Sequence, residues 1–370
     1  MKKAAFLIAL FLISSTVFSQ IEFQKGSVAE VLAMAKAQNK LVMVDVMTDW
    51  CKWCIELDNK VYAKKEVSDY ANAYQINYKI DAEKGEGIDF AKKYKIQGFP
   101  SILFLDGDGN EVDRVYGYVP AKDFMEMMQD YNKGINTFSY LKTEVEKNPS
   151  NIEASLKLAD KYSMYSEMDK AKELLNKIVE MDGSNAGGKT DDARFRLVLF
   201  TEKDEKAKLL EAFIADNPNS DQLKDAYVAL SETYYYDLND LPSSEKWFKE
   251  TLGKFPNDEF VGSSYGQYMN QRAIALADKK YTKEDSLKGL LNIEGFVNDN
   301  KTGLSYIETA LQYVAGSVNE ASSYYIQSRL YFNLQEYAKA KESIDKAIKI
   351  FDRKLYRDAR DKIEKQLSQK

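Results

Sequence analysis

Two cysteines, Cys51 and Cys54, are the residues whose type and spacing could do chemistry in this chain. They are its only cysteines, and its 370 residues include no histidine. Each is preceded by a tryptophan, Trp50 or Trp53. Two thiols separated by two residues can form a redox centre, a structural disulfide or half of a metal site. These three possibilities make different demands on the rest of the sequence.

The metal and structural interpretations find little support. A structural zinc ion takes four ligands, usually cysteine or histidine, and only a second chain could complete such a site here. A disulfide across two residues closes a very short loop, and stabilisation by loop closure grows with loop length. Glycine-rich stretches elsewhere lack the strand–turn–helix context of a phosphate-binding loop. We therefore expect no metal, no cofactor and little stability from a bridge between Cys51 and Cys54.

The redox interpretation fits the position of the two thiols. They follow an apolar run that ends near Met47, and they open a helical stretch. A thiol at a helix N-terminus meets the positive end of the helix dipole, which favours the thiolate, and Lys52 adds a positive charge. The first cysteine of such a turn points outward and the second lies one turn inside. We therefore expect Cys51 to attack a client disulfide and Cys54 to resolve the mixed disulfide.

An acidic residue interrupts the apolar run that precedes the cysteines. Asp45 lies in the middle of LVMVDVM, and a buried carboxylate is costly unless it has a partner or a function. Burial would raise its pKa and allow Asp45 to exchange a proton with Cys54. An edge-strand aspartate that faces water is the alternative. Further along, Pro100 opens the apolar run SILFL, a place where a strand tolerates proline.

Helical and strand patterns alternate from Ile21 to about Tyr131. Short apolar runs predict buried strands, and periods near 3.6 predict helices between them. Helices that connect strands give a mixed sheet covered on both faces, so we predict an α/β domain. The expected strands are Leu41–Met47, Ile76–Asp81, Ser101–Leu105 and Glu111–Tyr118. The expected helices are Ser27–Gln38, a stretch from the cysteines to Ala73, Gly87–Tyr94 and Ala121–Tyr131.

From about Gly134 onward the strand signals stop and helical pairs follow one another. Small residues lie where the paired helices would cross, with aromatic residues around them. This spacing resembles the tetratricopeptide repeat over residues 136–370, and it predicts an all-α repeat region that ends in a polar capping helix, Leu355 to Leu367. The many tyrosines of this half can pack between helices or line a concave peptide-binding surface.

The start of the chain predicts export. Lys2 and Lys3 precede an apolar run of about ten residues, which is shorter than the roughly 20 that a spanning helix needs. We expect a signal peptide over residues 1–19, cleaved between Ser19 and Gln20, with an uncleaved anchor as the alternative. The protein would then be periplasmic or secreted. Its formal net charge of -6 argues against a nucleic-acid partner.

The N-terminal motifs occur together in the order of a known family. Asp45, the Trp50-Cys51-x-x-Cys54 motif, Pro100 and Gly117 resemble thioredoxin over residues 21–133. In detail the stretch is similar to the periplasmic thioredoxin-like domains of thiol:disulfide interchange proteins. The resemblance implies a thioredoxin fold in which Pro100 is cis and faces the cysteines. It also implies a client-binding groove that is framed by Trp50, Phe99, Pro100 and Gly117.

The sequence departs from thioredoxin in three places. The dipeptide between the cysteines is Lys52-Trp53 instead of Gly-Pro, and this dipeptide strongly tunes the redox potential. Asn77 stands where thioredoxin has a lysine near the buried acid, although Lys79 is two residues on and could face the same way. Residues 82–87 lengthen the connection before the third helix. The first departure leaves the direction of electron flow open.

The sequence thus predicts four segments: a signal peptide at 1–19, a thioredoxin-like domain at 20–133, a linker helix at 134–147 and helical repeats at 148–370. We expect an exported thiol–disulfide oxidoreductase that reduces client protein disulfides and receives electrons from a membrane donor. The helical repeats would bind a protein partner. The alternatives are an oxidase or isomerase with a chaperone-like repeat domain, and a non-catalytic repeat-based binding protein.

Overall fold

The computed structural model describes residues 20–185, 188–280 and 289–369. The chain divides into two compact units, the first ending at Thr137 and the second beginning at Phe138. The predicted signal peptide lies outside the described residues. Within the described ranges, no helix is both long enough and apolar enough to cross a membrane.

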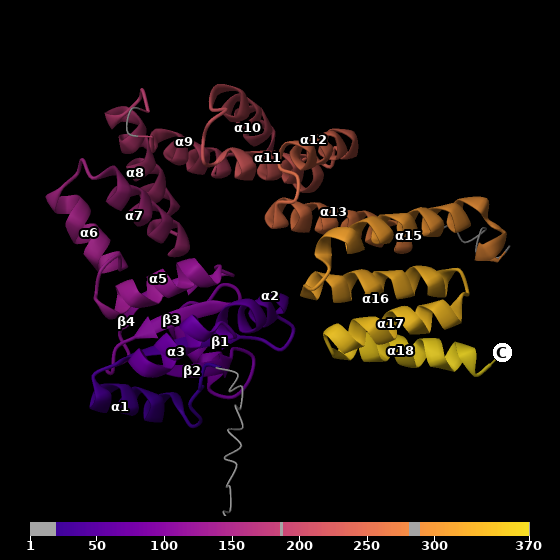
Figure 1. Cartoon of the computed structure of the whole chain (residues 1–370), viewed down its shortest axis with the longest axis horizontal. Helices are drawn as coiled ribbons and strands as arrows, with labels where there is room; N and C mark the ends of the chain where they lie inside the picture. The colour runs from indigo at the N-terminus through magenta and orange to yellow at the C-terminus, as the bar shows by residue number, and fades with distance from the viewer. Residues whose placement is uncertain (1–19, 186–187, 281–288, 370) are drawn as a thin grey trace, which may run out of the picture. The chain divides into compact units, whose positions relative to one another are not determined.

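The first unit is a four-stranded sheet with helices, as predicted (Figure 1). Its strands are β1 (Leu41–Met47), β2 (Gln75–Asp81), β3 (Ser101–Leu105) and β4 (Glu111–Tyr116). Its helices are α1 (Val28–Gln38), α2 (Lys52–Leu57), α3 (Lys65–Tyr74), α4 (Gly87–Lys93) and α5 (Ala121–Asn132), with a π-helical turn, η1 (Asp58–Tyr62), directly after α2. The helical stretch predicted after the cysteines is therefore three pieces.

The order of the sheet is β2-β1-β3-β4, so β1 is a central strand. It runs parallel to β2 and antiparallel to β3, and β4 pairs antiparallel with β3. In this register Asp45 lies opposite Lys79 of β2 and Ile102 of β3. The pairing of β1 with β2 therefore brings a lysine beside the acid that interrupts the apolar run.

Side chains alternate along β1 and divide the core between the two faces of the sheet. On one face Met43 packs with residues of α2, η1, α3 and α5. On the other face Val42, Val44 and Val46 pack with α1 and α4. Asp45 is two residues from Met43, so it lies on the face that α2 covers, and α2 carries Cys54.

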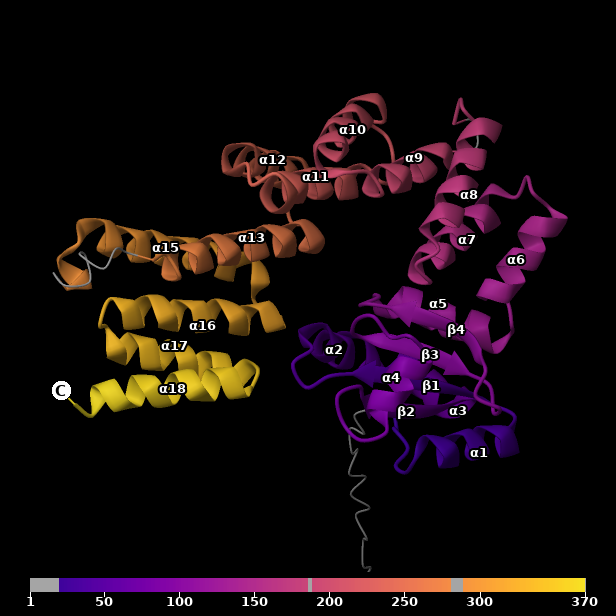
Figure 2. The ribbon, with the colours of Figure 1, turned by 180° about the vertical axis from the view of Figure 1, so that it is seen from behind.

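The second unit is all-helical. Its elements are α6 (Phe138–Lys147), α7 (Ile152–Met164), α8 (Met168–Met181), α9 (Thr190–Leu199), α10 (Lys203–Asp216), α11 (Leu223–Glu232), η2 (Thr233–Asp237), α12 (Leu241–Lys254), α13 (Glu259–Ala277), η3 (Leu290–Asn292), α15 (Glu294–Val314), α16 (Val318–Asn333), α17 (Tyr337–Ile350) and α18 (Lys354–Leu367). Neighbouring helices pack in sequence order, and Figures 1 and 2 both show α16, α17 and α18 side by side.

Small and aromatic residues hold these helices together. Ala321 of α16 is completely buried, as are Ala340 and Ala347 of α17, so the two helices can approach closely. Tyr268 and Tyr356 are also buried, at 1% and 2% exposure, which fits the packing role for these tyrosines. The last helix, α18, buries little besides Tyr356 and Ile363 and has the polar character predicted for a cap.

Candidate active site

Cys51 and Cys54 form a disulfide at the start of α2. Cys51 is the N-cap residue of this helix, and its Sγ accepts the backbone N–H of Cys54 at 3.1 Å. The sequence predicted that Cys51 would point outward, yet the two residues are almost equally buried, with 4% and 2% exposure. The oxidised pair therefore presents little surface, although the cap position gives the Cys51 sulfur a backbone hydrogen bond of the kind that stabilises a thiolate.

Asp45 is fully buried and paired with a lysine. Because β1 is central and Asp45 is 0% exposed, the alternative of an edge-strand aspartate that faces water is wrong. Lys79 Nζ lies 3.1 Å from Asp45 Oδ2, so the ammonium and the carboxylate form an ion pair. Lys79 thus faces the acid as the sequence suggested, and Asp45 makes no direct hydrogen bond to Cys54.

The surroundings of Asp45 bring its pKa close to neutral pH. Burial raises the pKa of Asp45 to about 6. The positive charge of Lys79 lowers this pKa, and the negative charge of Asp58 raises it further. Burial alone would lower the pKa of Lys79, but the charges of Asp45 and Asp58 outweigh it and the pKa is raised. A carboxyl group with a pKa close to the working pH is suited to accept and return a proton.

Two residues of this cluster were missed by the sequence analysis. Asp58 opens η1, and its Oδ1 lies 2.5 Å from Lys79 Nζ, so the lysine bridges two carboxylates. Tyr62, at the end of η1, is 3% exposed and its hydroxyl has no hydrogen-bond partner among the described residues. Burial raises the pKa of Tyr62, with smaller contributions from Asp45 and Asp58. The available signal was spacing, because Asp58 lies one helical turn after Cys54.

The residues expected to frame a client groove come from three segments. The Phe99–Pro100 peptide bond is cis, and Pro100 is buried. The N–H of Gly117 donates to the carbonyl oxygen of Pro100 at 2.9 Å, and Gly117 has a φ of +79°. The ring of Trp50 meets that of Phe99 edge to face, with centroids 5.8 Å apart. Trp50 therefore contacts Phe99 through its ring, and Gly117 is hydrogen-bonded to Pro100.

Residues 28–132 match the family of thioredoxin-like domains, and residues 321–352 match the tetratricopeptide repeat. Residues 28–132 thus form a thioredoxin-like domain. This domain, together with the disulfide in a Cys-x-x-Cys motif, is consistent with thiol–disulfide oxidoreductase chemistry.

Similar proteins come from several bacteria. The thiol:disulfide interchange protein DsbD of Yersinia pestis is 34% identical over 100 residues, which are 26% of this chain and 17% of that protein. The disulfide bond reductase DsbH of Chlamydia pneumoniae is 26% identical over 108 residues, 26% of this chain and 64% of that one. A solved structure of a candidate disulphide-isomerase from Bacteroides thetaiotaomicron is 34% identical, covering 30% of this chain and 93% of that chain, with a TM-score of 0.29. The chain thus spans under two thirds of the length of the DsbD and DsbH proteins.

The lengthened connection at 82–87 contacts the segment before the cysteines in the thioredoxin-like domain. The indole N–H of Trp50 donates to Glu83 Oε2 at 3.0 Å. Lys84 forms an ion pair with Asp49 and a second one, at 2.8 Å, with Asp81 at the end of β2. These contacts tie residues 49–50 to the sheet, and sequence analysis missed Glu83 because the partners lie 33 positions apart.

The dipeptide between the cysteines is only partly exposed, since Lys52 is half-buried and Trp53 is exposed. Trp53 is 37% exposed and its ring lies against Tyr118, with centroids 5.8 Å apart. Lys52 Nζ lies 5.4 Å from the centroid of the Trp53 ring. Burial lowers the pKa of Lys52, opposed by the charge of Glu56, whose carboxylate is also 3.2 Å from Lys60. The positive charge beside Cys51 is therefore partly balanced within α2.

Glu83→Ala should loosen the Trp50 ring. The lost hydrogen bond to an exposed indole is expected to lower the free energy of unfolding by about 0.5–1.5 kcal/mol. Since Trp50 is half exposed, its emission should also shift to the red as the ring gains access to water. Urea denaturation and tryptophan fluorescence would check both, with Glu66→Ala on α3 as the control for loss of an exposed carboxylate. Unchanged emission and stability would show that Glu83 does not hold the ring.

Proposed function

We propose that this protein reduces disulfides in client proteins through Cys51 and Cys54. The observation that carries the proposal is the Cys51–Cys54 disulfide at the start of α2, on the sheet face where Asp45 has a pKa of about 6. The relatives named as interchange protein and reductase support the same chemistry. Trp50, Phe99, Pro100 and Gly117 would bind the client backbone.

The reaction requires two exchanges of sulfur partners. The Cys51 thiolate attacks one client sulfur, the client S–S bond breaks, and its other sulfur leaves as a thiolate. Cys54 gives its proton to Asp45, and the new thiolate attacks Cys51 Sγ. The mixed disulfide breaks, the client leaves with both cysteines reduced, and Cys51 and Cys54 are joined as in the structure. Two electrons have passed to the client, and a dithiol donor at the membrane would return them.

The remaining parts of the proposal concern place and partners. The pattern of residues 1–19 supports export to the periplasm or beyond, where disulfides occur. The helical unit, with its tetratricopeptide repeat at 321–352, would bind a protein partner and so bring clients or the electron donor to the domain. Lys52 and Trp53 would set the redox potential.

Cys54→Ser should stop the reaction half-way. Without a resolving thiol, Cys51 remains in a mixed disulfide, so client proteins should appear as adducts that dithiothreitol releases. The wild-type protein should reduce insulin, and its potential should lie near that of thioredoxin, about -270 mV. The double variant Cys51→Ser, Cys54→Ser is the matched control and should trap nothing.

Two outcomes would contradict this proposal. No adduct together with no insulin reduction by the wild type would leave the cysteines without a catalytic role. A potential near about -120 to -180 mV would instead assign the direction of an oxidase or isomerase.

A further inference from the structure

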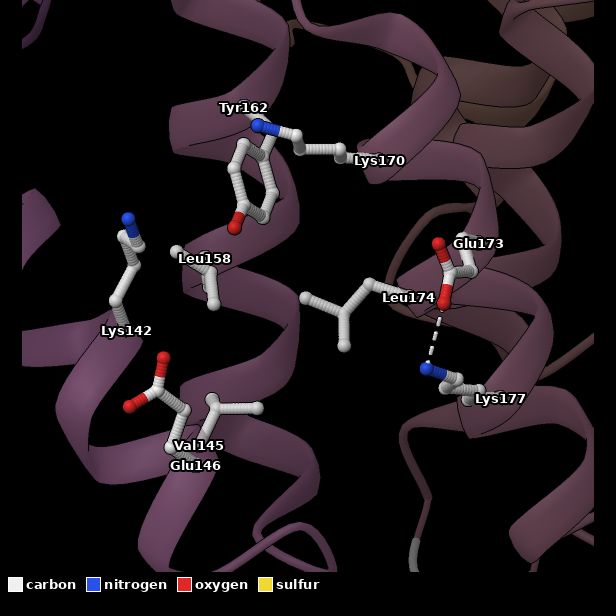
Figure 3. A pocket seen from close by; sticks show the side chains of 9 residues that line it. All are labelled: Lys142, Val145, Glu146, Leu158, Tyr162, Lys170, Glu173, Leu174 and Lys177. Carbon is white, nitrogen blue, oxygen red and sulfur yellow. Dashed lines mark hydrogen bonds and ion pairs between the residues drawn. The ribbon is translucent and has the colours of Figure 1, made fainter.

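A pocket of about 270 Å³ opens between the first three helices of the second unit (Figure 3). Helix α6 contributes Lys142, Val145 and Glu146, α7 contributes Leu158 and Tyr162, and α8 contributes Lys170, Glu173, Leu174 and Lys177. None of these residues takes part in the redox chemistry. All nine belong to one compact unit, so the pocket is complete within it.

The floor of this α6–α8 pocket is apolar. Leu158 is 3% exposed, and Figure 3 shows Leu174 directed toward it. The hydroxyl of Tyr162 points into the space above them. Cofactors and small-molecule ligands usually occupy about 300–1,000 Å³. The smaller volume and two leucines at the base fit a single large apolar side chain better than a cofactor.

Among the residues that the structure describes, the charged residues at the rim form ion pairs on the α8 side of the pocket but not on the α6 side. On α8, Lys177 is paired with Glu173 at 2.7 Å, and Lys170 is paired with Glu167. On α6, neither Lys142 nor Glu146 forms an ion pair with any residue in the described parts of the chain. Both are exposed and line the same pocket. Lys142 Nζ lies 5.6 Å from the centroid of the Phe138 ring, a contact that supplies no counter-charge. The α6 side of the pocket thus carries one positive and one negative charge that a charged ligand could pair with.

The spacing of these two charges matches an extended peptide. Four residues of helix rise about 6 Å, and in a strand residues i and i+2 are about 6.6 Å apart on the same side. An extended segment along α6 could therefore place one side chain at Lys142 and the next but one at Glu146. The residue between them points to the opposite side, toward the floor of Leu158 and Leu174.

We infer that the α6–α8 pocket binds an extended peptide segment in which an apolar residue stands between an acidic and a basic residue. The acidic side chain pairs with Lys142, the basic one with Glu146, and the apolar one lies against the two leucines. The inference rests on the proposed partner-binding role of the helical unit and names the chemistry of that partner. It does not depend on the reaction of Cys51 and Cys54.

Binding of short labelled peptides tests the inference, measured by fluorescence anisotropy at low salt. The protein is the full chain with both cysteines changed to serine, so that thiol exchange contributes nothing and a failure here leaves the redox proposal untouched. A peptide with a Glu-Leu-Lys core should bind more tightly than one with Glu-Leu-Glu, Lys-Leu-Lys or Glu-Ser-Lys. Like charges that meet at an interface lower affinity. Lys142→Glu should therefore weaken binding of the Glu-Leu-Lys peptide about tenfold.

The same substitution should also switch preference. Lys142→Glu presents two negative charges, so it should bind the Lys-Leu-Lys peptide more tightly than the parent protein does. Glu146→Lys should likewise favour the Glu-Leu-Glu peptide. Lys172→Glu changes an exposed lysine of α8 outside the pocket and should leave the preferences unchanged. Equal binding of all four peptides, or a switch caused equally by Lys172→Glu, would overturn the inference. The inference would also be overturned if the protein formed a dimer that Lys142→Glu dissociated and no peptide bound.

Discussion

Lys79→Met should lower the free energy of unfolding by about 3–5 kcal/mol at pH 8, the usual cost of removing one partner of a buried ion pair. Lys79 Nζ lies 3.1 Å from Asp45 and 2.5 Å from Asp58, so its loss leaves both carboxylates without their cation. Asp45 suffers more because it is completely buried, whereas Asp58 is partly exposed. Methionine keeps apolar contact with the rings of Phe23 and Tyr62, beside which the ammonium lies.

The loss should depend on pH in a defined direction. The charge of Lys79 lowers the pKa of Asp45, so its removal raises that pKa above the present value of about 6. Below pH 5 Asp45 is largely protonated in both proteins, and the difference between them should shrink. Urea denaturation at pH 5 and pH 8 measures this, with Lys92→Met at an exposed site of α4 as the control. A loss of equal size at both pH values would mean that packing, and not charge, explains the effect.

The candidate catalytic motif could be predicted because its residues are close in sequence or carry a strong local signal. Asp45 stood out as an acid in an apolar strand, and the Cys51 and Cys54 pair was followed by a helix. The edge-strand alternative for Asp45 could be rejected only when the sheet order was known, since strand order depends on contacts between distant segments. Lys79 was a candidate by position, and the parallel register of β1 and β2 made it a partner.

The residues that sequence reasoning missed are those whose role arises from tertiary contact. Asp58 and Tyr62 look like ordinary residues of an amphipathic helix, yet η1 turns both toward the partly buried Lys79. Glu83 was noticed only as part of a longer connection. Its bond to Trp50 exists because the end of β2 lies beside the end of β1. A π-helical turn and a parallel register are set by packing, which a single sequence does not display.

Asp45→Asn should make the oxidised protein more stable by about 3 kcal/mol at pH 8. The pKa of Asp45 rises from an ordinary value of 3.8 to about 6 in the folded protein, and each unit corresponds to about 1.36 kcal/mol. Between these values the folded state binds more protons than the unfolded state, so stability falls as pH rises. Wild-type stability should therefore decline from pH 3.8 to about 6. Asparagine removes that decline, and Lys79 keeps Asp58 as its partner.

Asp45→Asn should also slow disulfide reduction, although it stabilises the folded protein. Asparagine cannot accept the Cys54 proton, and loss of a general base commonly costs on the order of 10²-fold or more in rate. Insulin reduction should fall by that order near neutral pH, and release of the client from Cys51 should become the slow step. Asp58→Asn is the matched control: it removes the other carboxylate that pairs with Lys79, at a partly exposed site, and should give no gain in stability. If the free energy of unfolding changed between pH 4 and pH 8 by the same amount in Asp45→Asn as in the wild type, the raised pKa of Asp45 would be wrong. If it left the rate unchanged, Asp45 would have no part in resolving the mixed disulfide, and its burial beside Lys79 would have to be explained by the fold alone.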